Sequence, residues 1–232
     1  MKKRFLSLLC ILAFALPFVA ATPCFADTGE TTIDQITYRY DTETGEATVN
    51  DADESISGNA VIPGTIEVGD QKYKVTSIGD HAFSGCSSLT QIAIPEGVTS
   101  IGDHAFSGCS SLTQITIPEG VTSIGDHAFS DCLSLTQIAI PEGVTSIGDY
   151  AFAFCSSLKE ITIPEGVTSI GNGAFSNCTG LTEVYMKEGL IFGTGPFVDV
   201  PQGAHVWRYE VLKSAEASED GKVHVAIVSV ED

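Results

Sequence analysis

Three histidines recur at intervals of 23 residues, and each directly follows an aspartate, so the two side-chain types could together bind a metal ion. The histidines are His81, His104 and His127. An imidazole nitrogen binds Zn²⁺ at about 2.0–2.1 Å, and histidines in adjacent copies of a repeat could bracket such an ion. The alternative is an exposed row of side chains copied by sequence duplication. We favour the exposed row and assign no metal, and a metal-binding His/Asp ladder is the third-ranked interpretation of the chain.

Five cysteines recur with the same spacing. They are Cys86, Cys109, Cys132, Cys155 and Cys178. An odd number of cysteines in an exported protein raises the alternatives of disulfides and a free thiol. Because the spacing is constant, each cysteine occupies the same place in a repeated unit, where parallel side chains have poor Cβ geometry for a disulfide. We therefore expect a buried column of reduced cysteines that pack as small apolar side chains.

A third column consists of glutamates, whose carboxylates could bind calcium. It contains Glu96, Glu119, Glu142, Glu165 and Glu188. Calcium loops supply several oxygen ligands from a single loop, so we expect a solvated acidic edge here instead. The sequence has no Ser/His/Asp set, phosphate-binding loop or isolated carboxylate pair. We therefore predict a protein that is not an enzyme and needs no cofactor.

All three columns belong to one sequence repeat. The string VTSIGDHAFSGCSSLTQIAIPEG begins at Val75 and restarts at Val98, Val121, Val144 and Val167, and the fifth copy ends at Gly189. The first two copies differ only at Ala93 and Thr116. A unit of this length cannot bury its own apolar edge, whereas stacked units form a continuous core. The sequence therefore predicts a stack of coils of the same shape.

One copy indicates which side chains face the core. The pattern L-x-x-I-x-I over residues 89–94 predicts a short strand with its Leu and Ile side chains inward and Thr90, Gln91 and Ala93 outward. Pro95-Glu96-Gly97 predicts a turn that ends the strand. Asp103 is placed like a helix N-cap, so we expect about one helical turn after it, with Phe106 and Cys109 on its inward side.

The repeat resembles the BspA-type leucine-rich repeat, whose hallmark is I-P-x-x-V-x-x-I-G-x-x-A-F-x-x-C-x-x-L-x-x-I. The second copy carries the motif from Ile94-Pro95 to Ile115, and the resemblance covers residues 75–189. It implies a right-handed leucine-rich repeat solenoid, mainly β with short parallel strands and minor α in short helical turns. It also implies a protein of bacterial or protist surfaces that acts in adhesion and protein binding and has no catalytic activity in its repeats.

The segments on either side of the repeats are expected to cap the solenoid. Residues 27–74 form an N-terminal β cap, in which Ile36–Tyr40 and Glu46–Val49 alternate around Thr44-Gly45 as a hairpin. Residues 190–232 contain a degenerate repeat and a C-terminal cap, with a terminal strand over Lys222–Val230. Solenoids need such ends because an open stack exposes apolar surface and unpaired strand edges.

The first 26 residues predict an export signal that is removed. They carry a basic start, an apolar run interrupted by Pro17, and Cys24-Phe25-Ala26 before Asp27. A retained membrane anchor is the alternative, but the run is short and contains a helix-breaking proline. Residues 27–232 carry eight basic and 30 acidic residues, a formal charge of −22. Such a chain cannot neutralise phosphates, which argues against nucleic acid as a partner. We expect a secreted or cell-surface protein with no membrane span in the mature chain.

Outward strand positions and two C-terminal aromatics supply the candidate binding residues. These are Gln91, Gln114, Gln137, Glu160, Glu183, Tyr185 and Trp207, and the inward structural ladder consists of the five cysteines with Phe83, Phe106, Phe129, Phe152 and Phe175. Aromatic side chains usually carry much of the energy of an interface. The alternative for the two aromatics is that they cover the end of the core.

These features predict an adhesion or protein-binding module. The expected partner is a protein, such as a host matrix protein or another bacterial surface protein. The main alternative is a structural spacer or surface-coat component whose coils supply length and stability without a specific ligand site, and the uniform Gln rows favour it.

Overall fold

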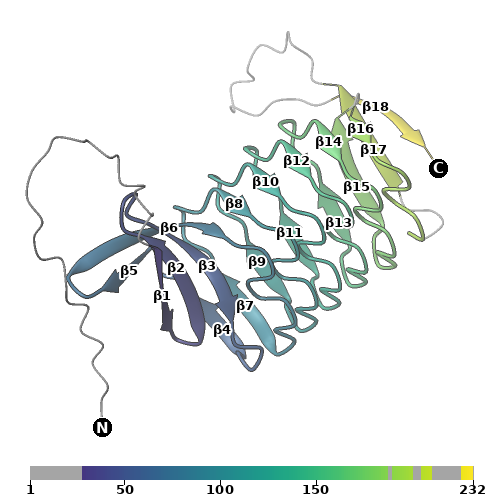
Figure 1. Cartoon of the computed structure of the whole chain (residues 1–232). Coiled ribbons are helices and arrows are strands. Elements are labelled where there is room, and N and C mark those ends of the chain that lie inside the picture. The colour runs from purple at the N-terminus through teal and green to yellow at the C-terminus, as the bar shows by residue number, and fades with distance from the viewer. Residues whose placement is uncertain (1–27, 188–189, 201–204, 211–225, 232) are drawn as a thin grey trace, which may run out of the picture.

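The computed structural model describes residues 28–187, 190–200, 205–210 and 226–231, and these form a stack of parallel coils (Figure 1). The expected export signal over residues 1–26 lies outside the described residues. Successive coils place equivalent residues side by side, with Gln91 opposite Gln114 and Gln114 opposite Gln137 in adjacent strands. The 23-residue sequence period is therefore one turn of the solenoid.

Each coil contributes one strand to each of two rows (Figure 1). The first strand row consists of β4 (Gly58–Val61), β7 (Leu89–Ala93), β9 (Gln114–Thr116), β11 (Gln137–Ala139), β13 (Glu160–Thr162), β15 (Glu183–Lys187), β17 (His205–Glu210) and β18 (Ala226–Glu231). The second strand row consists of β6 (Gln71–Ile78), β8 (Ser100–Ile101), β10 (Ser123–Ile124), β12 (Ser146–Ile147), β14 (Ser169–Ile170) and β16 (Ile191–Phe192). Within the repeats all neighbouring strands that pair are parallel.

The N-terminal strands extend the second row with antiparallel pairs. These strands are β1 (Thr28–Ile33), β2 (Ile36–Asp41), β3 (Glu46–Ala52) and β5 (Thr65–Val68). β2 and β3 form a hairpin in which the Gly45 N–H donates to the Asp41 carbonyl at 3.0 Å. β3 then pairs in parallel with β6, which leads into the first coil. The hairpin is thus continuous with the sheet of the solenoid.

The expected helical turn is absent, since all regular elements among the described residues are strands. His104 and Gly108 adopt left-handed backbone conformations, with φ of 55° and 74°, and these interrupt a right-handed helix. Successive backbone N–H groups in this segment also alternate between acceptors in the same coil and acceptors in the next coil. That of Ser107 donates within the coil to His104, whereas that of Phe106 donates to Ala128 of the next coil at 2.7 Å. A helix would satisfy both groups locally, and here half of them join one coil to the next.

The aspartate expected as a helix N-cap instead links neighbouring coils. Asp103 Oδ1 accepts a hydrogen bond from the backbone N–H of Asp126, at 2.8 Å. The same bond joins Asp80 to Asp103 and Asp126 to Asp149, and Asp149 accepts from both the backbone and the side chain of Asn172. The aspartate column is therefore part of the connection between coils.

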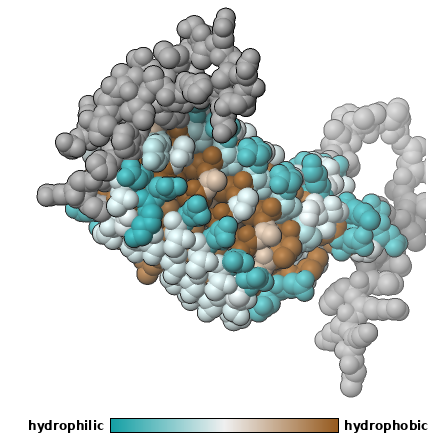
Figure 2. All heavy atoms as spheres, turned by 180° about the vertical axis from the view of Figure 1, so that it is seen from behind, coloured by the Kyte–Doolittle hydropathy of each residue, from teal (hydrophilic) through white to brown (hydrophobic). Residues whose placement is uncertain are grey.

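Inward side chains form a continuous core. The rings of Phe83, Phe106, Phe129, Phe152 and Phe175 are completely buried and lie parallel to one another, with centroids 5.2–5.3 Å apart. Phe197 continues the stack above Phe175 at 5.3 Å, and β16 pairs with β14, so residues 190–200 form part of a further coil. Seen from behind, apolar residues run along the stack between hydrophilic ones (Figure 2).

Candidate functional site

Outward side chains of the first strand row form regular lines across the coils. One line consists of Gln91, Gln114, Gln137, Glu160 and Glu183. The first four are exposed and Glu183 is half-buried. A second line, two residues further along each strand, reads Ala93, Thr116, Ala139, Thr162 and Tyr185. The structure therefore brings five of the predicted binding residues into one line and places Tyr185 in the line beside it.

Tyr185 lies at the C-terminal part of this surface. It is half-buried and stands opposite Thr162 in β13 and Trp207 in β17. Burial, together with the charges of Glu183 and Glu160, raises the pKa of the Tyr185 hydroxyl. Trp207 is placed only through the backbone of β17, and its side chain lies outside the described part of the chain. Among the two predicted aromatic binding residues, Tyr185 is thus the one whose side-chain surroundings the structure describes.

The first strand row is interrupted between the third and fourth coils. β7, β9 and β11 form one ladder and β13 continues into β15, but no backbone bridge between β11 and β13 occurs among the described residues. In the neighbouring steps a threonine hydroxyl donates to the preceding coil, as Thr136 does to the Thr113 carbonyl and Thr182 to that of Lys159. Lys159 holds the threonine position at the interrupted step and has no hydroxyl for this bond.

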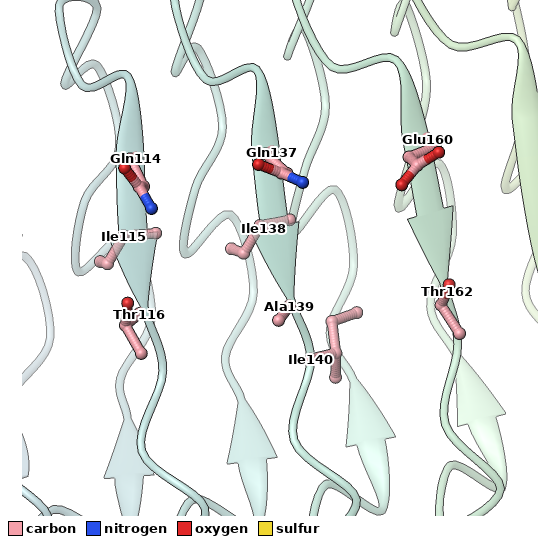
Figure 3. Close-up of a pocket in the computed structure, with 9 residues that line it drawn as sticks. All are labelled: Gln114, Ile115, Thr116, Gln137, Ile138, Ala139, Ile140, Glu160 and Thr162. Carbon is pink, nitrogen blue, oxygen red and sulfur yellow. The ribbon is translucent and has the colours of Figure 1, made fainter. Parts of the chain in front are cut away.

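A shallow groove of about 300 Å³ lies across this interruption (Figure 3). Its lining consists of Gln114, Ile115, Thr116, Gln137, Ile138, Ala139, Ile140, Glu160 and Thr162. The exposed fractions of Ile138 and Ile140 are 7% and 8%, against 1% and 0% for Ile161 and Ile163 in the next coil. The core isoleucines Ile138 and Ile140 are thus buried, and only their edges contribute to the lining.

The sequence did not indicate the floor of this groove. Ala139 lies between Thr116 and Thr162 in the same line. Because the alanine side chain is smaller than those of the two threonines, a hollow lies between them (Figure 3). The alternation of Ala and Thr was visible in the sequence, but nothing in the repeat predicted that β11 and β13 would lack a backbone bridge. The groove combines an apolar floor with the amides of Gln114 and Gln137 and the carboxylate of Glu160.

The histidine row forms a stack of rings. The imidazoles of His81, His104 and His127 are parallel, with centroids 4.6–4.7 Å apart, and Tyr150 continues the stack at 5.0 Å. The stack ends at Gly173, where a Cβ would lie 2.5 Å from the Tyr150 ring. Among the described residues no group of three or more His, Cys, Asp or Glu side chains is arranged to hold a metal ion. The histidine row is a stack of parallel rings beside aspartates that bond to the next coil.

Acid is expected to weaken the solenoid through His104. Burial lowers the pKa of its imidazole below the usual 6.5, the neighbouring His127 and His81 lower it further, and Asp103 and Asp126 partly oppose them. The unfolded chain then binds protons more readily, so this contribution to stability is complete above about pH 6.5 and is lost as the pH falls through the folded-state pKa.

His104→Tyr should keep the stack, because Tyr150 already occupies the equivalent position, and it removes the titrating group. We expect the variant to lose less stability than the wild-type protein between pH 7 and pH 5 in denaturant unfolding. Equal losses in the two proteins would contradict the role given to His104.

The cysteine column is buried, and its five thiols are unpaired. The Cys132 thiol donates to the Phe106 carbonyl of the preceding coil at 3.3 Å, and Cys109, Cys155 and Cys178 make equivalent bonds at 3.1–3.2 Å. Burial raises the pKa of the Cys132 thiol to about 12. The cysteines therefore act as buried donors that join successive coils.

These thiols should be inert in the folded protein. Because the thiolate is the nucleophile and burial disfavours it, we expect the five to react with a thiol reagent such as Ellman's reagent only after denaturation. Reaction is followed in native buffer and in guanidinium chloride, with no reductant present. Recovery of a single reactive thiol after denaturation would indicate two disulfides and contradict the expectation.

The arrangement of coils and core identifies the class of protein. Parallel coils with inward Leu and Ile, short strands in register and a buried Phe/Cys core constitute a leucine-rich repeat solenoid. A family model for the BspA type leucine rich repeat region matches residues 76–199 in six copies. The chain belongs to this BspA-type leucine-rich repeat family. The match extends over residues 190–199, so it includes a copy beyond the five regular repeats that the sequence predicted.

Solved bacterial structures share the fold. A leucine-rich repeat protein from Bacteroides ovatus is 33% identical, with a TM-score of 0.57, and the match covers 70% of this chain and 52% of that one. The T. pallidum leucine-rich repeat protein is 28% identical over 76% of this chain and 92% of that one, with a TM-score of 0.60. A leucine rich cell surface protein from Faecalibacterium prausnitzii is 28% identical over 83% of this chain and 59% of that one, with a TM-score of 0.63. This chain thus spans about half the length of the Bacteroides ovatus protein. A comparison with curated proteins finds no match.

Within the described residues, no helix is long and apolar enough to cross a membrane.

Proposed function

We propose that this protein is a non-catalytic binding module that holds a protein partner on its first strand row at the bacterial surface or in the surrounding medium. The observation that carries the proposal is the grooved, exposed surface across β9, β11 and β13, which a rigid stack of coils presents. A rigid scaffold lowers the entropic cost of ordering a binding surface. The Faecalibacterium prausnitzii relative is described as a cell surface protein, which supports the location.

Charge favours a protein over a nucleic acid as the partner. The formal charge of the whole chain is −19, and residues 27–232 carry −22. Phosphate backbones are bound by clustered Lys and Arg, which a chain of this composition lacks. A protein partner with basic surface residues would instead be attracted over distance.

A structural spacer is the second candidate function, and the first three coils favour it. Gln91, Gln114 and Gln137 are identical and carry no aromatic neighbour on the same surface. Residues of this kind rarely dominate the energy of an interface. The later coils differ, because Glu160, Glu183 and Tyr185 replace the uniform pattern. The binding module therefore stands ahead of the spacer.

Replacement of Tyr185 with alanine tests this proposal. Capture of host matrix proteins or bacterial envelope proteins by the purified protein should fall about tenfold or more, because truncation of an aromatic anchor at an interface commonly costs about 2 kcal/mol. The melting temperature of the variant is measured in parallel. Ser87→Ala, at an exposed turn position outside the first strand row, provides a surface control.

Loss of capture with unchanged melting supports Tyr185 as an anchor. A large fall in melting temperature with capture retained at low temperature would make Tyr185 part of the core instead. If the wild-type protein captures nothing above background, the spacer is the better description of the chain.

A further inference from the structure

We propose that the groove between β11 and β13 receives a lysine or arginine side chain of the partner, with the cation bonded to Glu160. The inference rests on the proposed function and specifies the chemistry that the first strand row recognises. It is carried by the shape of the groove, by the position of one carboxylate on it and by the charge of the chain.

The shape suits a side chain with an apolar stem and a polar head. The floor consists of Ala139 and the accessible edges of Ile138 and Ile140, and a volume of about 300 Å³ exceeds that of one long side chain. Lysine and arginine bury their methylene stems against apolar surface and keep the charged group at the rim. The floor lies across the step at which no backbone bridge joins β11 to β13.

The charge at the rim has one sign. Glu160 is the single charged residue in the lining, and Figure 3 places its carboxylate in line with the amides of Gln114 and Gln137. The amine of Lys159 lies instead beside Gly180 of the next coil, 3.3 Å from where a Cβ there would sit. A guanidinium or ammonium group in the groove would therefore meet the Glu160 carboxylate, a charge-assisted arrangement, beside the amides of Gln114 and Gln137.

The surroundings strengthen the attraction for a cation. Glu160 lies opposite Glu183 and Thr162 lies opposite Tyr185 in β13 and β15, so the carboxylate and the aromatic ring belong to one continuous surface. The net charge of −22 over residues 27–232 steers basic partners toward the protein at low ionic strength. A basic residue of the partner is thus the occupant that both the rim and the whole chain favour.

Two substitutions native to other coils test the site with little risk to folding. Glu160→Gln restores the residue found in the first three coils and removes the charge, and Ala139→Thr restores the residue found in the second and fourth coils and fills the hollow. The controls are Glu96→Gln, which removes an equal charge from an exposed turn, and Ala93→Thr, which makes the same change outside the groove.

The probe is a fluorescent glycine–serine peptide that contains several lysines, and binding to each purified variant is followed by anisotropy. Its counterparts carry arginine, acetyl-lysine or glutamate in place of lysine. We expect binding of the lysine and arginine peptides, with a dissociation constant raised about tenfold by Glu160→Gln and by Ala139→Thr. The two controls should leave it unchanged. The acetyl-lysine and glutamate peptides should not bind.

Equal weakening by Glu160→Gln and Glu96→Gln would show attraction to bulk charge and overturn the site. Binding of the acetyl-lysine peptide as tightly as the lysine peptide would also overturn it. The same variants are then used in the protein-capture experiment. If capture survives both groove substitutions and the lysine peptide does not bind, the groove is refuted and the binding module stands. If the wild-type protein captures nothing above background, both proposals are refuted.

Discussion

Replacing Phe129 with alanine is expected to lower the free energy of unfolding by about 3–5 kcal/mol, the range for removing a large buried aromatic side chain. The Phe129 ring is fully buried and stacks between Phe106 and Phe152, with centroids 5.3 Å away on each side. The cavity therefore weakens two coil–coil contacts at once. Solenoid stability is the sum of such nearest-neighbour contacts, so the middle of the stack is where the loss is greatest.

Denaturant unfolding monitored by circular dichroism measures this effect, and Phe192→Ala is the matched control. Phe192 is 37% exposed and meets Phe197 edge-on at 6.3 Å near the C-terminal end of the described stack. The same chemical change there should cost about 1 kcal/mol, since much less surface is buried. Equal losses at the two sites would contradict a core that depends on the central phenylalanines.

Replacing Gly125 with alanine is expected to cost about 3 kcal/mol, at the upper end of the usual range for overpacking. A Cβ at this position would lie 2.5 Å from Asp103 Oδ1, 2.6 Å from the Gly102 carbonyl carbon and 2.7 Å from the Asp103 nitrogen. Two of these atoms are backbone and cannot rotate away. The coils would have to separate, which weakens the hydrogen bond from the Asp126 N–H to Asp103.

Gly64→Ala supplies the control for this prediction. The nearest atom to a Cβ at Gly64 is the Pro95 Cβ at 3.6 Å, an ordinary contact, so alanine should be tolerated or slightly stabilising. Thermal and chemical unfolding of both variants decide the point. If Gly125→Ala unfolds at the same denaturant concentration as Gly64→Ala, close approach of the coils does not explain the glycine at position 125.

The coil and its core could be predicted from the sequence because they follow from periodicity alone. A strict interval of 23 residues puts each Phe, Cys and Leu at the same place in every coil, and apolar side chains at equivalent places pack on one another. Phe129 and Cys132 illustrate this, since both are fully buried. The outward direction of Gln137 follows equally from the alternation of side chains along a strand.

Local propensity misled the prediction of the segment between Asp103 and Cys109. Asp before an apolar pair is typical of a helix N-terminus. In the solenoid, the carboxylate and half of the backbone N–H groups bond to neighbouring coils, and the left-handed conformation of His104 permits this arrangement. Contacts between coils thus override the local preference, and no single copy of the repeat reveals them.

The groove could not be predicted because it lies across two coils, at a step where the backbone pairing of the first strand row is interrupted. The sequence shows Lys159 in place of threonine and Ala139 between two threonines, but each is a single change at an exposed position and does not by itself indicate a groove. Only the structure places both at the step where β11 and β13 do not pair. Departures from a near-perfect repeat therefore indicate where its surface changes from one coil to the next.

The most direct test of the central proposal is capture of matrix and envelope proteins by two surface variants in parallel. One carries Gln114→Ala, Gln137→Ala and Tyr185→Ala on the first strand row, and the other carries Ser84→Ala and Ser107→Ala on the turn segments outside it. Both should melt like the wild-type protein. We predict that the first variant loses the captured protein and the second retains it, whereas undiminished capture by the first would contradict binding through this surface.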